Sequence, residues 1–301
     1  MRRLVGGEQP PMSLSVVVVS TQSPQLLSET LSGLVPQCQR AHAKIIVARA
    51  PTAPAFDELA EFAPGRLVVC ERGASIPSIR AAGLRSATGD WVVLTEDNCV
   101  PRPDWLARLI ARFGADVDVL GGTIGDVLHR GAINAGACFA EYGFYGACRA
   151  TARPGSAPSI TCANVAYRRT VVRDVATWSA NGDWDNVLHD RLAAGGARFG
   201  GVADAVVDEN LEHRLAVFAR HRFRHGLDYA ARRSSALGTG RRIGLACGSP
   251  ALPLLLTWRV WRSAGRAAPA TFARALPFTI AFFTAWAAGE AAGYLGAGNS
   301  T

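Results

Sequence analysis

The sequence predicts an α/β fold in which helices flank a mixed, mainly parallel sheet, with a hydrophobic helical appendage at the carboxyl end. Three observations lead to this prediction. Valine-rich runs of the length of buried strands alternate, from Leu14 onward, with segments of helical apolar spacing. The strand expected at residues 91–95 runs directly into Glu96, Asp97 and Asn98, and open α/β sheets place their ligand crevice at such strand ends. After Gly238, long stretches of the chain are nearly free of charge.

Length and composition allow one large folded domain with a smaller appendage. The chain has 301 residues, of which 49% are hydrophobic, so it can bury a full core. We expect three regions. Residues 1–12 form a flexible arm that lacks the apolar segment of a secretory signal, residues 13–238 form the α/β domain, and residues 239–301 form the hydrophobic helical region.

The net charge of +8 comes almost wholly from arginine, because Lys44 is the only lysine. Such a basic excess suits an anionic partner, which can be nucleotide phosphates, an anionic membrane surface or nucleic acid. A compositional bias toward arginine, alanine and glycine explains it equally well. No motif interleaves aromatic with basic residues, so we expect no nucleic-acid partner. The seven cysteines lack paired spacing, which indicates free thiols in a reducing cytoplasm.

The first part of the chain alternates strands and helices. The expected elements are a strand at 14–19, a helix at 26–35, a strand at 44–48, a short helix within 51–64, a strand at 66–70, a helix at 75–88 and the strand at 91–95. Strands joined by helices in this rhythm imply right-handed crossovers and a parallel sheet.

The second part of the chain has a less regular pattern. The expected elements are a helix at 105–113, a strand at 117–120, an irregular segment at 133–148 and a loop at 153–158. They continue with a strand at 160–167, a helix at 186–194, a last strand at 198–207 and a long basic helix at 211–233. Asp104 is placed to cap the first of these helices.

The polar turn after residues 91–95 is the first candidate for a functional site. Glu96 and Asp97 supply carboxylates and Asn98 supplies an amide oxygen. Hard divalent ions prefer such oxygen ligands, and these ions also bind phosphate oxygens. An acidic turn on a soluble protein is, however, often only solvated surface.

Three more polar residues lie at the ends of expected elements. Asn164 can hydrogen-bond a phosphate or a sugar hydroxyl, or its amide can be satisfied inside the protein. Asp183 and Asp185 precede an expected helix, where capping and the helix dipole alone would favour them.

Three segments occur in an order that is typical of one enzyme family. The first is Arg80 to Asp90, the second is Glu96-Asp97-Asn98 with Pro101 and Asp104-Trp105-Leu106 behind it, and the third is Asn164-Val165-Ala166-Tyr167-Arg168-Arg169. All three resemble motifs of the inverting glycosyltransferases of family 2. The first resembles the family's Arg-Asn-x-Gly-x-x-x-Ala-x-Gly-Asp helix and the second resembles its Asp-x-Asp turn. The third resembles its Asn-x-Ala-x-Arg-Arg segment beside the donor phosphates. The resemblance extends from Leu14 to about Arg233.

The resemblance implies a single nucleotide-binding domain of the GT-A type. It also implies transfer of a sugar from a nucleoside diphosphate donor to an acceptor hydroxyl. We expect the donor nucleotide to contact Ser20, Arg80, Glu96, Asp97 and Asn164. Asp97 and Asn98 would hold a divalent cation, Mg²⁺ or Mn²⁺, that neutralises charge on the departing diphosphate.

The catalytic base is assigned by the same resemblance. In the family, an acidic pair seven residues ahead of an Arg-Leu-x-x-x-Gly pattern supplies the base. Arg191-Leu192-Ala193-Ala194-Gly195 fixes the register and places Asp185 at the base position, with Trp184 where the other acid is usual.

Two departures from the family pattern affect the expected site. Ala48-Arg49-Ala50 stands where the family usually has an aspartate that reads the donor base, so the base is not predicted. Asn98 replaces the aspartate that commonly binds the metal, and its neutral oxygen is a weaker ligand, which predicts weak metal dependence.

Two charge-poor runs, at residues 243–261 and 275–296, suggest contact with a membrane. The second is just long enough to cross a bilayer, but it contains Glu290, and two prolines interrupt the first. Spanning helices, helices in the interface and a hairpin packed on the catalytic domain all remain open. We expect membrane attachment because Trp258, Trp261 and nearby arginines are interface anchors. The catalytic domain would then lie at the cytoplasmic face of the plasma membrane and use a glycan or lipid-linked acceptor.

Two other classes of protein are compatible with the sequence. A binding or scaffolding protein could keep the fold without transfer activity, as Asn98 and the missing base-reading acid suggest. A nucleotidyltransferase could use a similar sheet, but the sequence lacks an evident glycine- and lysine-rich triphosphate loop near the first strand.

Overall fold

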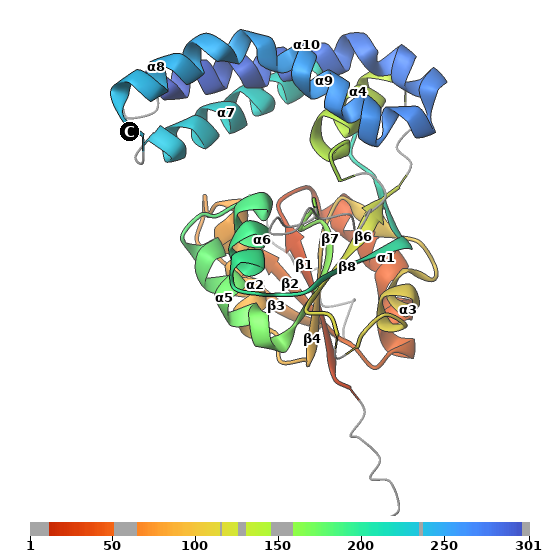
Figure 1. The fold of residues 1–301 in the computed structure, drawn as a ribbon. Helices are drawn as coiled ribbons and strands as arrows, with labels where there is room; N and C mark the ends of the chain where they lie inside the picture. The colour runs from red at the N-terminus through yellow and green to blue at the C-terminus, as the bar shows by residue number, and fades with distance from the viewer. Residues whose placement is uncertain are drawn as a thin grey trace, which may run out of the picture. The chain divides into compact units, whose positions relative to one another are not determined.

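The computed structural model of the chain describes residues 12–50, 65–114, 116–125, 131–145, 159–234 and 237–296. They belong to two units (Figure 1). The first unit comprises Met1–Gly125 and Ala147–Asn210, and the second comprises Asp126–Gly146 and Leu211–Thr301. The boundary expected at residue 238 therefore lies inside the second unit.

An eight-stranded sheet forms the centre of the first unit. Its strands are β1 (Leu14–Ser20), β2 (Lys44–Arg49), β3 (Gly65–Val69), β4 (Trp91–Glu96), β5 (Cys99–Pro101), β6 (Val119–Ile124), β7 (Asn164–Arg168) and β8 (Phe199–Glu209). Their order is β3-β2-β1-β4-β7-β6-β8-β5. The pairs β1–β2, β1–β4, β2–β3 and β6–β8 are parallel, and β4–β7, β6–β7 and β5–β8 are antiparallel. This confirms the predicted mixed, mainly parallel sheet.

Helices cover both faces of this sheet. They are α1 (Pro24–Arg40), α2 (Ile76–Ser86), α3 (Trp105–Ile110), α5 (Arg169–Ala180) and α6 (Asp185–Ala194). Helices α2, α5 and α6 lie on one face, and α1 and α3 lie on the other (Figure 1). Every residue of β1 is buried as a result, which explains its uninterrupted run of valines. Helix α2 packs directly on β1 at Gly83, where an added Cβ would lie 2.5 Å from Cγ1 of Val17.

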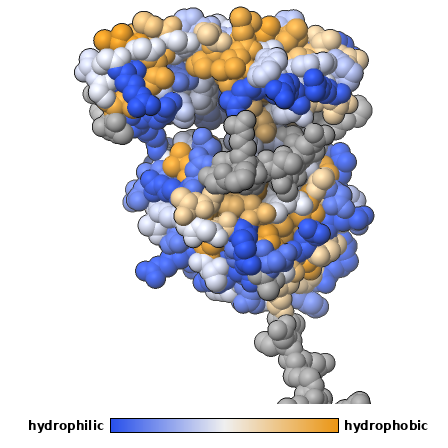
Figure 2. Space-filling view, in the orientation of Figure 1, coloured by the Kyte–Doolittle hydropathy of each residue, from blue (hydrophilic) through white to orange (hydrophobic). Residues whose placement is uncertain are grey.

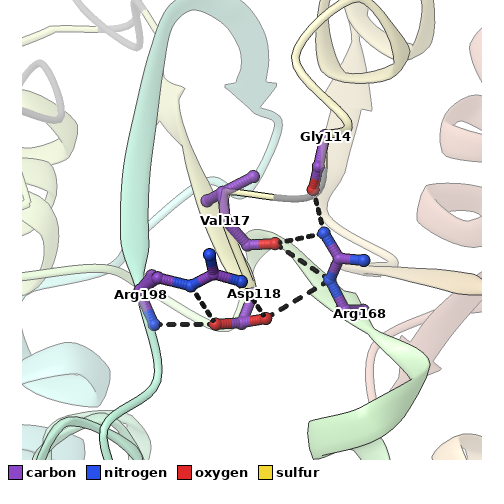
Figure 3. A network of polar contacts seen from close by, with 5 residues as sticks. All are labelled: Gly114, Val117, Asp118, Arg168 and Arg198. Carbon is purple, nitrogen blue, oxygen red and sulfur yellow. Dashed lines mark hydrogen bonds and ion pairs between the residues drawn. The ribbon is translucent and has the colours of Figure 1, made fainter.

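A network of ion pairs and hydrogen bonds connects three strands at the end of the sheet where β4 begins (Figure 3). Arg168 donates from Nε and Nη2 to the carbonyl oxygen of Val117 and from Nη2 to that of Gly114. Its Nε also lies 3.3 Å from Oδ1 of Asp118, and Arg198 Nε lies 3.1 Å from Oδ2 of the same carboxylate. The network joins the starts of β6 and β8 to the end of β7.

The second unit consists of helices. They are α4 (Ala132–Tyr142), α7 (Leu215–Ser234), α8 (Thr239–Gly248), α9 (Leu252–Ser263) and α10 (Pro269–Tyr294), with the 3₁₀ turns η3 (Ser249–Ala251) and η4 (Gly265–Ala267). Helix α10 packs against each of the other four helices. Their apolar core contains Phe139 of α4, Phe218 of α7, Val260 of α9, and Phe272 and Phe282 of α10.

One helical run among the described residues is long and apolar enough to cross a membrane by these two criteria alone. It is Thr239–Ser263, which joins α8, η3 and α9. The expectation from the sequence had favoured the later run at 275–296 on length. A core helix of a soluble protein passes the same two criteria, so the finding by itself is weak support for a membrane span.

Several elements differ from the sequence predictions. The segment at 133–148, predicted to be irregular, contains the regular helix α4. Gly136 weakens helix propensity there, but it is required because an added Cβ would lie 2.6 Å from Cβ of Phe278 on α10. Helix α5 was not predicted, although its buried Val172, Val175, Ala176 and Ser179 have helical spacing.

Smaller differences concern strand and helix ends. The strand predicted at 160–167 begins only at Asn164, and the short strand β5 was not predicted. Asp104 occupies the N-cap of α3 but makes no capping hydrogen bond, so its predicted capping role is wrong. The predicted helix within 51–64, the loop at 153–158 and residues 1–11 of the arm lie outside the described residues.

Candidate functional site

A buried ion pair joins the two helices that carry Arg80 and Asp185. Nη2 of Arg80, on α2, lies 3.0 Å from Oδ1 of Asp185, the first residue of α6. Oδ2 of Asp185 accepts hydrogen bonds from the backbone N of Cys162 at 2.8 Å and from Oγ1 of Thr161 at 3.3 Å. The Arg80 side chain is 2% exposed and that of Asp185 is 14% exposed. The carboxylate is thus fixed from three directions, and its Oδ1 is buried although the side chain keeps some exposure.

This environment holds Asp185 in its ionised form. Burial raises the pKa of Asp185, but the charge of Arg80 and the N–H of Cys162 outweigh that effect and place it below its ordinary value. The hydrogen bonds of the carboxylate go to Thr161 and Cys162, and Trp184 is the N-cap of α6, so capping does not explain Asp185. Asp183 instead pairs with Arg191 at 3.0 Å.

A second buried polar pair lies behind Asp185. The hydroxyl of Tyr167, on β7, lies 2.8 Å from Nε2 of His189, one helical turn after Asp185, and 3.5 Å from Sγ of Cys162. Both rings are buried. Burial lowers the pKa of His189 to about 4, although the charge of Asp185 opposes the shift. His189 is therefore a neutral packing and hydrogen-bonding residue near pH 7.

We expect His189 to make folding stability depend on pH. The unfolded chain binds a proton at this residue near pH 6.5, whereas the folded chain does so only at about 4. The free energy of unfolding should therefore fall by roughly 3 kcal/mol as pH drops from 6.5 to 4, since one pKa unit corresponds to about 1.4 kcal/mol. Denaturant titrations at several pH values measure this loss. His189→Gln should lack it and the exposed His42→Gln should retain it; equal slopes in all three proteins would contradict the assignment.

A second polar network surrounds Asp97 at the end of β4. Oδ2 of Asp97 accepts hydrogen bonds from Oγ of Ser20 at 2.9 Å and from the backbone N of Thr21 and Gln22 at 2.9 and 2.8 Å. Nη1 of Arg49 donates to the same Ser20 hydroxyl at 2.8 Å, and Nη2 donates to the carbonyl of Gln22 at 3.2 Å. Asp97 and Arg49 together hold the loop between β1 and α1.

The Asp97 carboxylate is only partly satisfied by this network. Burial raises the pKa of Asp97, while the three donors and the charge of Arg49 act in the opposite direction. Its second oxygen, Oδ1, is buried and has no hydrogen-bond partner among the described residues. Ser20, in contrast, both donates to Asp97 and accepts from Arg49, so its hydroxyl is engaged within the protein.

The fit of a divalent cation to these residues depends on two oxygens. The described residues contain no group of three or more His, Cys, Asp or Glu side chains that could hold a metal ion. Asp97 offers the orphaned Oδ1, and the Asn98 amide oxygen accepts only a weak bond from Sγ of Cys99 at 3.9 Å. Two such oxygens suit a cation that takes its other ligands from phosphate and water.

Two other residues, Glu96 and Asn164, were predicted to contact the nucleotide of the sugar donor, and they differ in their exposure. Glu96 ends β4 and is partly exposed, and its charge acts on Arg80, so the two lie in one electrostatic environment. Asn164 is fully buried. Its Nδ2 donates to the carbonyls of Thr123 and Ala205, each at 2.9 Å, and its Oδ1 accepts from Nε1 of Trp105 at 2.9 Å. The interior role considered for Asn164 therefore matches its contacts.

The two arginines that follow in this segment also have structural contacts. Arg168 belongs to the network of Figure 3, opposite Trp91 in the β4–β7 register, whereas Asn164 lies opposite Thr95. Arg169 donates from its backbone N to the carbonyl of Asp90 at 2.7 Å. Because β7 runs antiparallel to β4, Arg168 and Arg169 lie at the opposite end of β7 from Asn164, and the placement of this segment beside donor phosphates stays a prediction.

Sequence reasoning did not identify Arg49, Cys162 or His189 as parts of these networks. A buried arginine at the end of an apolar strand was a detectable signal for Arg49, since such a charge requires a partner. The backbone N–H of Cys162 carries no sequence signal at all. The Tyr167–His189 bond joins residues from a strand and a helix, and only the fold reveals it.

A family model described as glycosyltransferase like family 2 matches residues 10–227. The chain belongs to this family. The match covers the sheet, the networks around Asp185 and Asp97, and most of α7. Membership of this family makes the chain a glycosyltransferase. No curated protein sequence matches the chain.

Solved structures resemble this glycosyltransferase at low sequence identity. The mannosyltransferase PcManGT from Pyrobaculum calidifontis, in complex with GDP-Man and Mn²⁺, has a TM-score of 0.51 and 18% identity, covering 92% of this chain and 86% of that chain. TarS 1–349 from S. aureus has a TM-score of 0.43 and 12% identity, with 90% of both chains covered. Glucosyl-3-phosphoglycerate synthase from Mycobacterium tuberculosis has a TM-score of 0.42 and 13% identity, covering 69% and 75%. The first of these confirms the predicted GT-A fold.

Proposed function

We propose that this family 2 enzyme transfers a sugar, with inversion, from a nucleoside diphosphate donor to an acceptor hydroxyl, and that Asp185 is the general base. The observation that carries the proposal is the Asp185 carboxylate, which is ionised and fixed by Arg80, Cys162 and Thr161, on a side chain that is 14% exposed. A base for an attacking hydroxyl needs these properties, together with a distance of about 3 Å to the acceptor oxygen.

Arg80 acts on the reaction through Asp185. Its positive charge keeps the base ionised before the acceptor binds, and the ion pair fixes the direction of Oδ1. Oδ2 is aligned by the Cys162 N–H, so neither oxygen has to reorganise when the proton arrives. Nε and Nη1 of Arg80 are buried without hydrogen-bond partners among the described residues. These atoms are as buried as the rest of the side chain, so the diphosphate contact expected for Arg80 stays a prediction.

The donor side of the proposed site lies at the end of β4. Glu96 would hold the ribose, and Asp97 Oδ1 with the Asn98 amide oxygen would hold the divalent cation. When bound, the cation neutralises charge on the departing diphosphate. The Mn²⁺ and GDP-Man in the mannosyltransferase of the same fold support this proposal. Ser20 contributes by fixing the β1–α1 loop through Asp97 and Arg49.

A panel of nucleoside diphosphate sugars tests the proposed function. Each would be incubated with the full chain and an acceptor extract, with and without Mg²⁺ or Mn²⁺, and the released nucleoside diphosphate measured. Release that depends on one donor and on an acceptor supports inverting transfer when the product anomer is opposite to that of the donor. Donor binding without release would identify a binding protein on the same fold. Release of pyrophosphate in a parallel reaction with nucleoside triphosphates and a sugar 1-phosphate would identify a nucleotidyltransferase.

The same proposal includes attachment of the chain to the cytoplasmic face of the plasma membrane. The apolar run Thr239–Ser263 and the basic residues of the second unit support it. An acceptor that is lipid-linked or part of a cell-envelope glycan would then be presented at the same surface.

We expect Asn98→Asp to strengthen the effect of a divalent cation. The substitution adds a charged oxygen beside Asp97, and carboxylates bind Mg²⁺ and Mn²⁺ more tightly than amides do. The concentration of Mn²⁺ that gives half-maximal turnover should fall about tenfold or more. Asn181→Asp, at the exposed C-cap of α5, is the matched control and should behave like the wild type. If chelators leave wild-type turnover unchanged and Asn98→Asp adds no metal response, the turn does not bind a catalytic cation.

A further inference from the structure

The net charge of the chain lies wholly in its second unit. Asp126–Gly146 and Leu211–Thr301 contain 13 arginines and 5 acidic residues, whereas the first unit contains 19 basic and 19 acidic residues. The excess of +8 therefore belongs to the helical unit and not to the sheet that carries Asp185. A concentration of positive charge on one unit indicates that this unit, and not only the nucleotide site, meets an anionic partner.

An exposed stripe runs along α8, η3 and α9. Its members recur at intervals of three or four residues, namely Ile243, Cys247, Ala251, Leu254, Leu255 and Trp258. Leu254 is 73% exposed and Trp258 is 53% exposed. The opposite side of the same run is buried at Ala246, Pro253 and Val260 and packs on α10. The 25 residues of the run extend about 37 Å, so the stripe is a long apolar face that the unit leaves uncovered.

Arginines border this stripe. The guanidinium of Arg262 lies 4.9 Å from the ring centroid of Trp258, and Arg241 and Arg266 are exposed at the two ends of the run. Figure 2 shows apolar surface on the second unit with hydrophilic side chains beside it. Leucine and tryptophan between arginines match the boundary between lipid headgroups and acyl chains.

The packing of the unit argues against a bilayer span. Helix α7 has exposed charges at Arg220, Arg224, Asp228 and Arg232, which hydrocarbon would not accommodate. Helix α10 contacts α7 so closely that a Cβ on Gly289 would collide with the carbonyl of Phe223. Since α8 and α9 pack in turn on α10, a crossing by the α8–α9 run alone would break these contacts.

We propose that the second unit docks on an anionic lipid surface through the α8–α9 stripe, with both helices lying in the plane of the interface and no described helix crossing the bilayer. The inference deepens the proposed membrane attachment. Its tests require no transferase activity, so the failure of the docking and the failure of the catalytic proposal can be distinguished.

Vesicle binding by the full chain tests the docking face. We expect the chain to sediment with phosphatidylcholine vesicles that contain an anionic phospholipid, and to bind more weakly in high salt or without the anionic lipid. Leu254→Ser should weaken binding about tenfold, and Leu254→Ser combined with Trp258→Ser about a hundredfold, because buried apolar area is lost. Val69→Ser, at an apolar side chain of β3 that is 65% exposed, is the matched control and should bind like the wild type.

Two results of this experiment would overturn the docking face. Equal vesicle binding by Leu254→Ser and the wild type would exclude the stripe as the lipid contact. Light scattering separates a further case, in which the wild type is an oligomer, Leu254→Ser is a monomer and neither binds vesicles. The stripe would then be an interface between copies of this chain.

Cysteine labelling tests the in-plane arrangement. Gly240→Cys and Ala267→Cys flank the run at exposed positions, and a Cβ at residue 240 meets no atom within 4 Å. Each is made in a Cys247→Ser background, since Cys247 is an exposed thiol. In sealed inside-out membrane vesicles from expressing cells, a membrane-impermeant maleimide should label both positions equally. Labelling of one position only, with the other reacting after detergent is added, would show that the run spans the membrane and would overturn the proposal.

Discussion

Asp185→Asn should reduce turnover by roughly a hundredfold or more, while donor affinity stays close to that of the wild type. The asparagine side chain has nearly the same shape but cannot accept a proton, so the acceptor hydroxyl would attack without a base. The ion pair with Arg80 is lost as well, which leaves a buried guanidinium without its partner. Single-turnover kinetics with the preferred donor, together with donor titration and a thermal melt, separate the loss of chemistry from a loss of folding.

Asp183→Asn is the matched control for this experiment. It makes the same chemical change two residues away, where the carboxylate pairs with the half-exposed Arg191. Turnover by this variant should remain within a few-fold of the wild type. If Asp185→Asn keeps near-wild-type turnover, Asp185 is not the base, and if it instead loses donor affinity, the residue belongs to the donor site.

Asp97→Ala should lower the free energy of unfolding by about 3 kcal/mol, because it removes the acceptor of three hydrogen bonds and a negative charge that acts on Arg49. Arg49→Met removes the cation instead. The double variant should be more stable than the sum of the two single losses predicts, by about 1 kcal/mol or more, since both residues hold the β1–α1 loop through the hydroxyl of Ser20. Denaturant unfolding of all four proteins gives this coupling energy.

Asp104→Ala provides the reference for an aspartate without such a network. Its carboxylate is 75% exposed and lies 3.8 Å from Arg108, so its removal should change stability by well under 1 kcal/mol. Additive losses for Asp97→Ala and Arg49→Met would contradict a coupled pair. In that case the hydrogen bonds to the β1–α1 loop alone would account for the role of Asp97.

The sequence predicted the sheet well because its central strands are covered on both sides. Uninterrupted apolar runs, such as that of β1, have few other stable arrangements in a chain with this order of elements. Helix α4 was harder to predict, since Gly136 opposes a helix locally and is favoured only by its contact with α10. Local propensity and tertiary packing disagree at that position, and packing decides the outcome.

The sequence suggested candidate site residues but not the contacts that they make. The motif register selected Asp185 and the turn at Glu96, and the structure places each of them in a buried polar network or at the end of β4. The partners of these residues come from distant parts of the chain. Arg49 and Asp97 are 48 positions apart, and the interaction of Asp185 with Cys162 uses a backbone N–H that every residue except proline possesses. No residue pattern encodes such contacts.

The missing side chain at Gly83 links the packing of α2 to the strength of the proposed base. Arg80 lies one turn before Gly83 on the same helix, and Gly83 lets that helix rest directly on Val17 and Ala48 of the sheet. The guanidinium is thereby held at a fixed depth beneath Asp185, where a shift of half an ångström changes the Coulomb energy of a 3.0 Å pair appreciably. A methyl group added at residue 83 would push α2 away from the sheet and move Arg80 with it. The pKa of Asp185, 102 residues later, therefore depends on the absence of a side chain at residue 83.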